Sequence, residues 1–591
     1  MIVPYFQRKT LRDQPFSTPN AIDHMTLPHC SRSRSVRVRT PHALSLALTL
    51  ALVYPFGVAL AAAPIGGGQI LQEVQPPPVP RPILRPELTV EQPLAPQVPP
   101  SVAFLVSHIE ITGNTLLPTT ELHALVVSSE GKSLTLADLN ALAGRITQYY
   151  HEHGYLLAQA YIPAQTLSGG TVQIAVLEAR YGAINLQNTS SVSDRPLKAT
   201  LAPLQSGAPV TQDALDRSLL LLADIPGVLV NSTLRPGNTS GTSDLLVDVT
   251  SGDTYSGSVS LDNSGSRYTG RPRLSAGLNV NSPFHQGDSM TLNALSAGRG
   301  LNYGRVGYQF LLDGQGTRLG AAVSALNYRL SNGLSGIGAN GTAEVETLQL
   351  SHPFIRSVSG NLYGQLEYDN KQLRDHIDVI SNQTDRHTNS LVAILAGDHK
   401  DSSGITNFNL SATVGNVAFD NAAAQSIDTT GARTQGGYVK VNFSLARLQQ
   451  ISSSNTVYAA LTGQLANTNL DSSEQFILGG PNSVRGYDVS AIAGAQGILL
   501  TLELRHNLTM PTSGLLQAIA FIDAGRVQVD KTAFVSGSNS EMISGAGVGL
   551  IWFGAQGLSV TSGIAAPIGG TPKLIGNTAS ARLWIQVQQG F

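Results

Sequence analysis

The chain has 591 residues, enough for several domains, and only 13% of them are charged, about half the level of soluble globular proteins. Its single cysteine, Cys30, excludes a disulfide framework and a cysteine-ligated metal site. Residues 1–63 carry seven of the 37 basic and two of the 39 acidic residues, so the remainder has a net charge of −7 and no reason to bind nucleic acid. Few charges together with 59 glycines favour an outer-membrane barrel over a cytosolic enzyme.

Residues 1–63 are predicted to be a secretory signal peptide with an extended N-terminal region. An arginine cluster, an apolar run and a series of small alanines follow one another here: Arg32–Arg39, Ala43–Val53 and Ala59–Ala63. The alternative is a membrane anchor, because the apolar stretch approaches spanning length. Pro55 and Gly57 interrupt it, and the small residues at its end favour cleavage.

Residues 64–101 are predicted to hold a short helix and a proline-rich linker. Gly68–Gln75 is the helix candidate, and prolines are frequent from Pro76 to Pro100. Such a stretch is extended and semi-rigid, and it cannot form a core.

Residues 102–180 and 181–253 are predicted to be two α+β modules of order β-α-α-β-β. The first shows the following elements: a strand ending at Gly113-Asn114, a helix through Leu122–Val126, a helix at Leu136–His153, and strands at Tyr155–Ile162 and Thr171–Leu177. The second repeats the order less clearly: a strand at Gly182–Leu186, helices at Pro196–Leu204 and Asp213–Leu222, and strands at Val228–Leu234 and Leu245–Val249.

Residues 254–591 alternate with a period of two and are predicted to form an all-β transmembrane barrel. Leu500, Leu502 and Leu504 alternate with the polar residues Thr501, Glu503 and Arg505. This is the pattern of a strand with one face toward lipid. At roughly 20 residues per strand and connection, this length gives about 16 antiparallel strands, wide enough for an aqueous channel.

One arginine in this region stands out. The motif Val484-Arg485-Gly486-Tyr487 follows the hydrophobic run that begins at Phe476, and an arginine cannot face lipid without a large penalty. Asp523, inside the otherwise apolar Phe521–Gly525, is a candidate partner. The two residues suggest a barrel that holds a loop in its interior.

The chain ends in Phe591, and Leu583, Ile585 and Val587 share its face of the last strand. This is the form of the C-terminal signal by which barrel proteins are handed to their assembly machinery.

The two modules resemble POTRA domains, with Ile111–Thr115 and Gly154–Gln165 as the best-matching segments. The whole mature chain resembles the two-partner-secretion transporters, the TpsB or ShlB/FhaC/HecB haemolysin secretion/activation family. The resemblance implies a 16-stranded barrel in which Arg485 pairs with Asp523 and fixes the loop in the lumen. Such a pair either gates transport or simply stabilises the barrel.

The resemblance further implies a bacterial outer-membrane location with POTRA modules in the periplasm, where they bind the N-terminal secretion domain of one large haemolysin or adhesin. Membrane lipid and the barrel-assembly machinery are the other expected partners. Two segments depart from the family pattern. Gln69–Gln75 is short and followed at once by proline, which argues against plugging of the barrel by this helix. The presumed turn Gly494–Gly497 lacks the charged pair often found there.

No catalytic residue, cofactor or metal is expected. His151-Glu152-His153 ends a helix without a third ligand in view, and Gly545–Gly549 lacks the lysine of a phosphate-binding loop. Asp523 has no second carboxylate or nucleophile near it in sequence. Two other functions compete with dedicated export: a general barrel-assembly factor of the same superfamily, and a passive porin-like channel.

Overall fold

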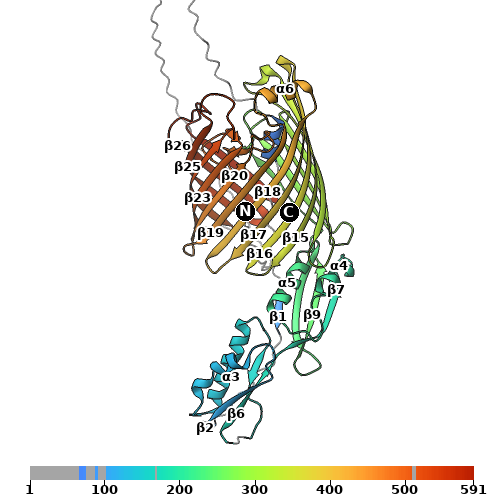
Figure 1. The fold of residues 1–591 in the computed structure, drawn as a ribbon, viewed down its shortest axis with the longest axis vertical. Coiled ribbons are helices and arrows are strands. Elements are labelled where there is room, and N and C mark those ends of the chain that lie inside the picture. Colours follow the sequence, from blue (N-terminus) through green and yellow to red (C-terminus); the bar gives the residue numbers. More distant parts are fainter. Residues whose placement is uncertain (1–65, 75–86, 91–100, 167–168, 509–513) are drawn as a thin grey trace, which may run out of the picture. The chain divides into compact units, whose positions relative to one another are not determined.

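The computed structural model describes residues 66–74, 87–90, 101–166, 169–508 and 514–591. The predicted signal peptide and most of the proline-rich linker lie outside the described residues. Within them the chain forms two small α+β modules and a closed β-barrel (Figure 1). No helix of the described segments is long and apolar enough to cross a membrane.

The first module packs its longest helix, α3 (Leu136–Glu152), on a three-stranded sheet of order β3-β6-β5. Ile146 and Tyr150 of this helix are fully buried in one core with Val172 and Ile174 of the sheet. The other elements of the module are β2 (Phe104–Val106), β3 (His108–Thr112), α2 (Thr119–Ala124), η1 (Val127–Ser129), β4 (Lys132–Leu134), β5 (Gln159–Tyr161) and β6 (Thr171–Leu177).

One carboxylate fixes the turn that follows β3. Glu178 Oε1 accepts hydrogen bonds from the main-chain N–H groups of Thr115 and Leu116, both at 2.7 Å, and from the hydroxyl of Tyr150 at 2.8 Å. Partial burial raises the pKa of Glu178, but these bonds favour the charged form more strongly and hold the pKa below its usual range.

The second module has a four-stranded sheet of order β1-β8-β9-β7. Its elements are β7 (Arg180–Asn188), α4 (Asp194–Leu201), α5 (Gln212–Ala223), β8 (Val228–Pro236) and β9 (Thr242–Ser251). The remaining strand, β1 (Glu87–Val90), comes from the segment predicted to be linker and pairs in parallel with β8. The chain therefore covers one edge of this sheet with its own residues.

Two local predictions differ from the structure. The strand predicted over Tyr155–Ile162 is shorter, because the N–H of Tyr155 bonds to the carbonyl of Tyr150 and the N–H of Ala158 to that of Tyr155, which makes this stretch a turn. The strand β1 was not predicted, because a segment of four residues between prolines is too short to show the alternation of apolar and polar residues that marks a strand.

The barrel closes sixteen antiparallel strands, with β10 paired to β27. These are β10 (Tyr255–Asp262), β11 (Arg273–Asn281), β12 (Ser289–Ser296), β13 (Leu301–Leu311), β14 (Arg318–Arg329), β15 (Ala339–Arg356), β16 (Gly360–Ile377), β17 (Asn382–Lys400), β18 (Gly404–Phe419), β19 (Gly436–Gln450), β20 (Asn455–Ala466), β23 (Gln496–Leu508), β24 (Leu515–Gln528), β25 (Ser540–Phe553), β26 (Leu558–Ile568) and β27 (Arg582–Gly590). The expected fold class, α+β modules followed by an all-β barrel, is confirmed.

The connections carry the remaining short elements, which are η2 (Ser335–Ile337), η3 (Asp378–Ile380), α6 (Ala422–Thr430) and η4 (Ala555–Gly557). The alternating pattern follows the wall as expected. Leu500, Leu502 and Leu504 of β23 are exposed on its outer face, while Glu503 between them is buried. A leucine side chain that faces lipid costs no free energy. A charged side chain that faces lipid costs a great deal, so it points into the barrel and pairs there.

Candidate functional site

The connection between β20 and β23, residues 467–495, folds back as a hairpin. Its short strands β21 (Phe476–Leu478) and β22 (Ile492–Gly494) pair in antiparallel fashion. We call residues 467–495 the folded loop. Side chains of Phe476, Leu478 and Ile492 form a buried cluster with Val527 of β24 and Ile543 of β25, so the loop packs on the inner face of the barrel wall.

Arg485 lies at the tip of the folded loop and binds two carboxylates of the wall. Its guanidinium donates to both oxygens of Asp523, at 2.8 and 2.7 Å, and to Oε1 of Glu503 at 2.6 Å. The guanidinium carbon also lies 3.4 Å from the ring centre of Phe521. This fork of donors and a flat cationic face are properties of arginine that lysine does not share.

The structure thus brings together Arg485 and Asp523, the two residues that the sequence suggested as partners. Asp523 lies on β24 with no exposed side-chain surface. Glu503, on the neighbouring β23, was missed as a third member of the group. A signal for Glu503 was available in the sequence. Glu503 alternates with lipid-facing leucines, so its charged side chain must point into the barrel, where it could bind the arginine predicted there.

The other motif residues have separate packing roles. Val484 and Tyr487 are buried in the cluster beneath the loop. Gly486 lies against the backbone of β26, where a Cβ atom would come within 2.8 Å of main-chain atoms of Ala566 and Pro567. Gly545 of β25, the first glycine of the segment that resembles a phosphate loop, approaches the backbone of Gly486 in the same way, since a Cβ atom there would come within 3.0 Å of the Gly486 nitrogen.

A second ion pair and a tryptophan hold the tip on its other side. Both oxygens of Asp488 accept from the guanidinium of Arg582, at 2.5 and 2.8 Å, and one also accepts from Arg271 at 2.8 Å. The indole N–H of Trp584 donates to the main-chain carbonyl of Arg485 at 2.8 Å. Strand β27 and the turn that precedes β11 therefore join β23 and β24 in fixing the tip.

The base of the folded loop is anchored to different strands by a buried cationic pair. The ammonium groups of Lys371 on β16 and Lys440 on β19 lie 2.6 and 2.8 Å from the carboxylate of Glu474. Glu474 is 2% exposed. If the folded loop left the wall, both ammonium groups would lose the carboxylate of Glu474. These two ion pairs therefore favour the folded position of the loop.

Arg386 of β17 extends this anchor. Its guanidinium binds Asp471 at 2.5 Å, the hydroxyl of Ser472 at 3.0 Å and Asp375 of β16 at 2.7 Å. Asp375 in turn accepts from the main-chain N–H of Gly67 at 2.8 Å. One arginine therefore connects the base of the loop to the first residue of the helix α1 (Gly67–Val74).

Helix α1 lies between the folded loop and the inner wall of the barrel. Its apolar face packs on inward side chains of β13, β14, β15 and β16 and on Leu330, which follows β14; the buried members are Ile70, Leu71, Val74, Leu301, Tyr303, Leu326, Tyr328, Leu330, Ala339, Ala343, Val345 and Leu373. Its other face meets the loop. Gln72 donates to the carbonyl of Ser472 at 3.0 Å, and Glu73 accepts from the hydroxyl of Ser490.

The position of α1 corrects the argument that a short helix followed by proline does not plug the barrel. A helix of eight residues is long enough to occupy the lumen, because it packs closely against both the inner wall and the folded loop. A Cβ atom on Gly68 would come within 2.5 Å of the main-chain nitrogen of Ser473, so glycine lets the helix touch the loop directly. The presumed turn at Gly494–Gly497 is also different, since Gly494 ends β22 and Gln496 begins β23.

The remaining candidates lie elsewhere. His151 and His153 each bond to a main-chain carbonyl, that of Ala158 at 3.1 Å and that of Tyr149 at 2.7 Å, so the two rings are engaged separately. Phe591 lies at the seam of the barrel, where its main-chain N–H and carbonyl pair with Gly257 of β10.

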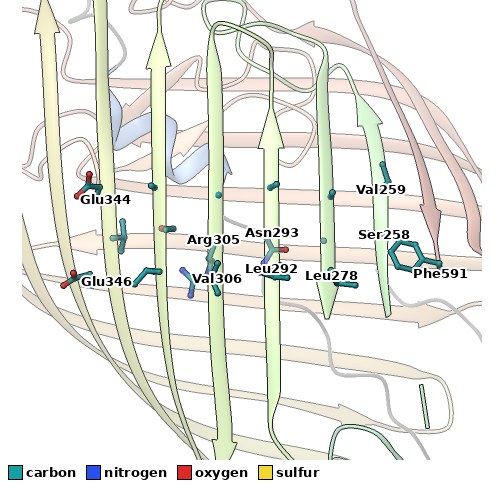
Figure 2. A pocket seen from close by; sticks show the side chains of 18 residues that line it. Ser258, Val259, Leu278, Leu292, Asn293, Arg305, Val306, Glu344, Glu346 and Phe591 are labelled. Atoms are coloured by element: carbon teal, nitrogen blue, oxygen red, sulfur yellow. The ribbon is translucent and has the colours of Figure 1, made fainter. Parts of the chain in front are cut away.

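A shallow apolar pocket reaches from this seam across strands β10 to β15 (Figure 2). Val259 and Phe591 lie at one end of it, and Glu344 and Glu346 lie at the other. Its floor is one cross-strand row of small side chains in register: Ala276, Ala294, Gly304 and Ala325. Val259 in the same row is exposed, so the pocket belongs to the outer face of the wall and not to the lumen.

Comparison with known proteins identifies both parts of the chain. The family described as haemolysin secretion/activation protein ShlB/FhaC/HecB matches residues 241–551, and the ShlB-type POTRA domain matches residues 104–179. The heme/hemopexin transporter protein HuxB of Haemophilus influenzae is 28% identical over 513 residues, which cover 85% of this chain and 90% of that protein.

A second relative supports the same assignment in sequence and in structure. The outer membrane transporter CdiB of Escherichia coli is 27% identical over 473 residues, 78% of this chain and 77% of that protein. A solved structure of CdiB from Escherichia coli superposes with a TM-score of 0.66 at 22% identity, and the match covers 85% of this chain and 92% of that one. The structural likeness concerns the fold.

Proposed function

Because the chain belongs to the haemolysin secretion/activation family ShlB/FhaC/HecB, we propose that it exports one large partner exoprotein by two-partner secretion. It is an outer-membrane transporter with periplasmic POTRA modules. The match of residues 241–551 to this family carries the assignment. The relatives named for heme/hemopexin transport and for outer-membrane transport align with this chain over 90% and 77% of their own length.

The partner enters through the periplasmic modules. We propose that its N-terminal secretion domain binds as an extended segment at a sheet edge, where main-chain hydrogen bonds give affinity without demanding sequence. In the second module β1 covers β8, which leaves β7 and the four-residue β1 as the two edges of that sheet. In the first module both β3 and β5 are edges of the three-stranded sheet.

Passage through the barrel requires the lumen to be cleared of α1. The helix is held by one buried apolar face and by a few polar contacts at Asp375, Ser472 and Ser490. We propose that α1 leaves during transport while the tip of the folded loop keeps its contacts to Asp523 and Glu503. Export by this route involves no covalent chemistry by the chain. Folding of a repetitive partner outside the cell gives the movement its direction.

The test of this function is quantitative proteomics of the culture medium and the outer membrane, with and without the gene. Loss of one large protein from the medium, with other barrel proteins unchanged, is the expected result. A broad fall in outer-membrane barrels would instead identify a general assembly factor. An unchanged medium with altered uptake of small solutes would identify a passive channel.

Two further partners follow from the barrel itself. We propose that membrane lipid covers the exposed apolar side chains of the outer wall, including the apolar floor of the pocket of Figure 2 but not its charged end at Glu344 and Glu346. We also propose that the barrel-assembly machinery recognises Phe591. The side chain of Phe591 is 67% exposed, and its ring lies beside Gly257, where a Cβ atom would come within 2.8 Å of it.

Replacement of Phe591 by alanine is therefore expected to lower the amount of protein in the outer membrane several-fold. The substitution keeps the main-chain pairing with Gly257, so the loss comes from the aromatic ring and not from barrel closure. Immunoblots of outer-membrane fractions measure the level. Leu550→Ala, which removes an exposed apolar side chain from β25, outside the last strand, is the matched control and should leave the level unchanged. Equal levels for all three proteins would contradict a recognition role.

A further inference from the structure

The first periplasmic module contains a group of metal-ligating side chains that no part of the export function uses. His108, His123 and Glu130 place one ligand atom each within 4.8 Å of one another. His108 begins β3, His123 lies in the last turn of α2, and Glu130 follows the short helix η1. The three residues come from three different elements, so spacing along the sequence did not reveal them.

The ring nitrogens converge on the carboxylate. Nδ1 of His108 lies 2.9 Å from Oε1 of Glu130, and Nε2 of His123 lies 3.1 Å from the same oxygen. Two ligand atoms on a tetrahedral zinc ion with bonds of about 2.0–2.1 Å are about 3.3 Å apart. The two ring nitrogens lie within 4.8 Å of each other, so a cation fits between the three atoms once the two histidine side chains move closer together.

The protein backbone holds the carboxylate in place. The main-chain N–H of Ile109, a buried residue of β3, donates to Oε1 of Glu130 at 2.8 Å. The next residue, Gly131, donates its N–H to the carbonyl of Val106 at 2.7 Å. A ligand oriented by a second hydrogen bond is typical of built metal sites.

We propose that His108, His123 and Glu130 form a zinc site on the first periplasmic module. Two imidazoles and one carboxylate are a donor set that suits Zn²⁺, while calcium and magnesium prefer oxygen ligands alone. The ion binds Nδ1 of His108 and Nε2 of His123 as the unprotonated nitrogens of neutral rings, so each ring carries its single proton on its other nitrogen.

The fourth position of this site faces solvent. The side chain of His108 is 58% exposed, whereas those of His123 and Glu130 are 30% and 20% exposed. Three protein ligands and one open position leave room for water or for a donor from a bound molecule. The ion ties α2 and η1 to β3, which is an edge strand of the three-stranded sheet. The zinc site does not depend on the export function.

The test is a titration of the purified mature chain in detergent with ZnCl2, in competition with a chromophoric chelator. One saturable site is expected, and His108→Ala or Glu130→Gln should weaken its affinity at least about tenfold. Glutamine retains an acceptor for the Ile109 N–H, so the second variant keeps the local backbone bond. The matched control is the double variant His151→Ala/His153→Ala, whose rings bind separate carbonyls and whose loss should leave zinc affinity unchanged.

Cobalt supplies an independent measurement. Co²⁺ in place of zinc should give visible absorption bands with the intensity typical of four-coordinate cobalt, and Glu130→Gln should abolish them. Hydrogen exchange of residues 104–166 in each variant shows that the module is still folded. Absence of a saturable site, or equal zinc affinity in the wild type and in His108→Ala, would overturn the assignment.

Discussion

Replacement of Arg485 by alanine is expected to reduce secretion of the partner protein at least about tenfold, while the barrel still reaches the outer membrane. Asp523 is fully buried, and the substitution removes the cation that pairs with it. Glu503 loses one of its two arginine partners and keeps Arg505. Removing one member of a buried ion pair costs about 3–5 kcal/mol. Since 1.4 kcal/mol is a factor of ten, the folded position of the loop tip loses most of its advantage.

Secretion is measured as the ratio of partner protein in the medium to transporter in the outer membrane. Arg447→Ala is the matched control, because Arg447 also pairs with an aspartate, Asp401, but on β19 and the turn before β18, away from the folded loop. Arg485→Lys should fall between wild type and alanine, because one ammonium cannot bind both oxygens of Asp523 and Glu503 together.

A double variant separates transport from stability. Arg485→Met with Asp523→Asn removes the uncompensated buried charge, so barrel levels should equal those of the wild type. Secretion should stay low if the arginine positions the loop for export. Full secretion by this double variant would show that the pair only stabilises the barrel.

Deletion of Gly67–Val74 is expected to raise the conductance of the purified channel several-fold in planar lipid bilayers. The helix fills the space between the inner wall and the folded loop, with Ile70 and Leu71 buried and Gly68 in contact with the loop backbone. Its removal opens that space to ions. The loop keeps its anchors at Glu474 and Arg485, so the barrel should remain folded.

Arg386→Met should reproduce part of this effect without deleting any residue. The substitution disconnects Asp375, which caps α1, from Asp471 at the base of the loop. We expect more frequent open events at the conductance of the deletion variant. Arg374→Met, an exposed arginine next to Asp375 on the same strand, is the control and should leave the current unchanged. A closed, unaltered channel after deletion of the helix would contradict its role as a plug.

The sequence by itself determined the class of the fold and the face of the residues in those strands that alternate clearly. Strand geometry has a period of two, so alternation at Leu500, Leu502 and Leu504 reveals which positions meet lipid. The high cost of a lipid-facing charge then assigns Arg485 and Asp523 to the interior before any contact is known.

Only the tertiary structure decided which interior charges meet. Glu503, the pair of lysines around Glu474, and the link from Arg386 to α1 depend on barrel closure and on the path of a loop that crosses the lumen. The contacts of α1 join residues more than 300 positions apart, Gly67 to Asp375 and Gln72 to Ser472. Local periodicity carries no information at that range, because pairing across a lumen follows from the shape of the whole wall.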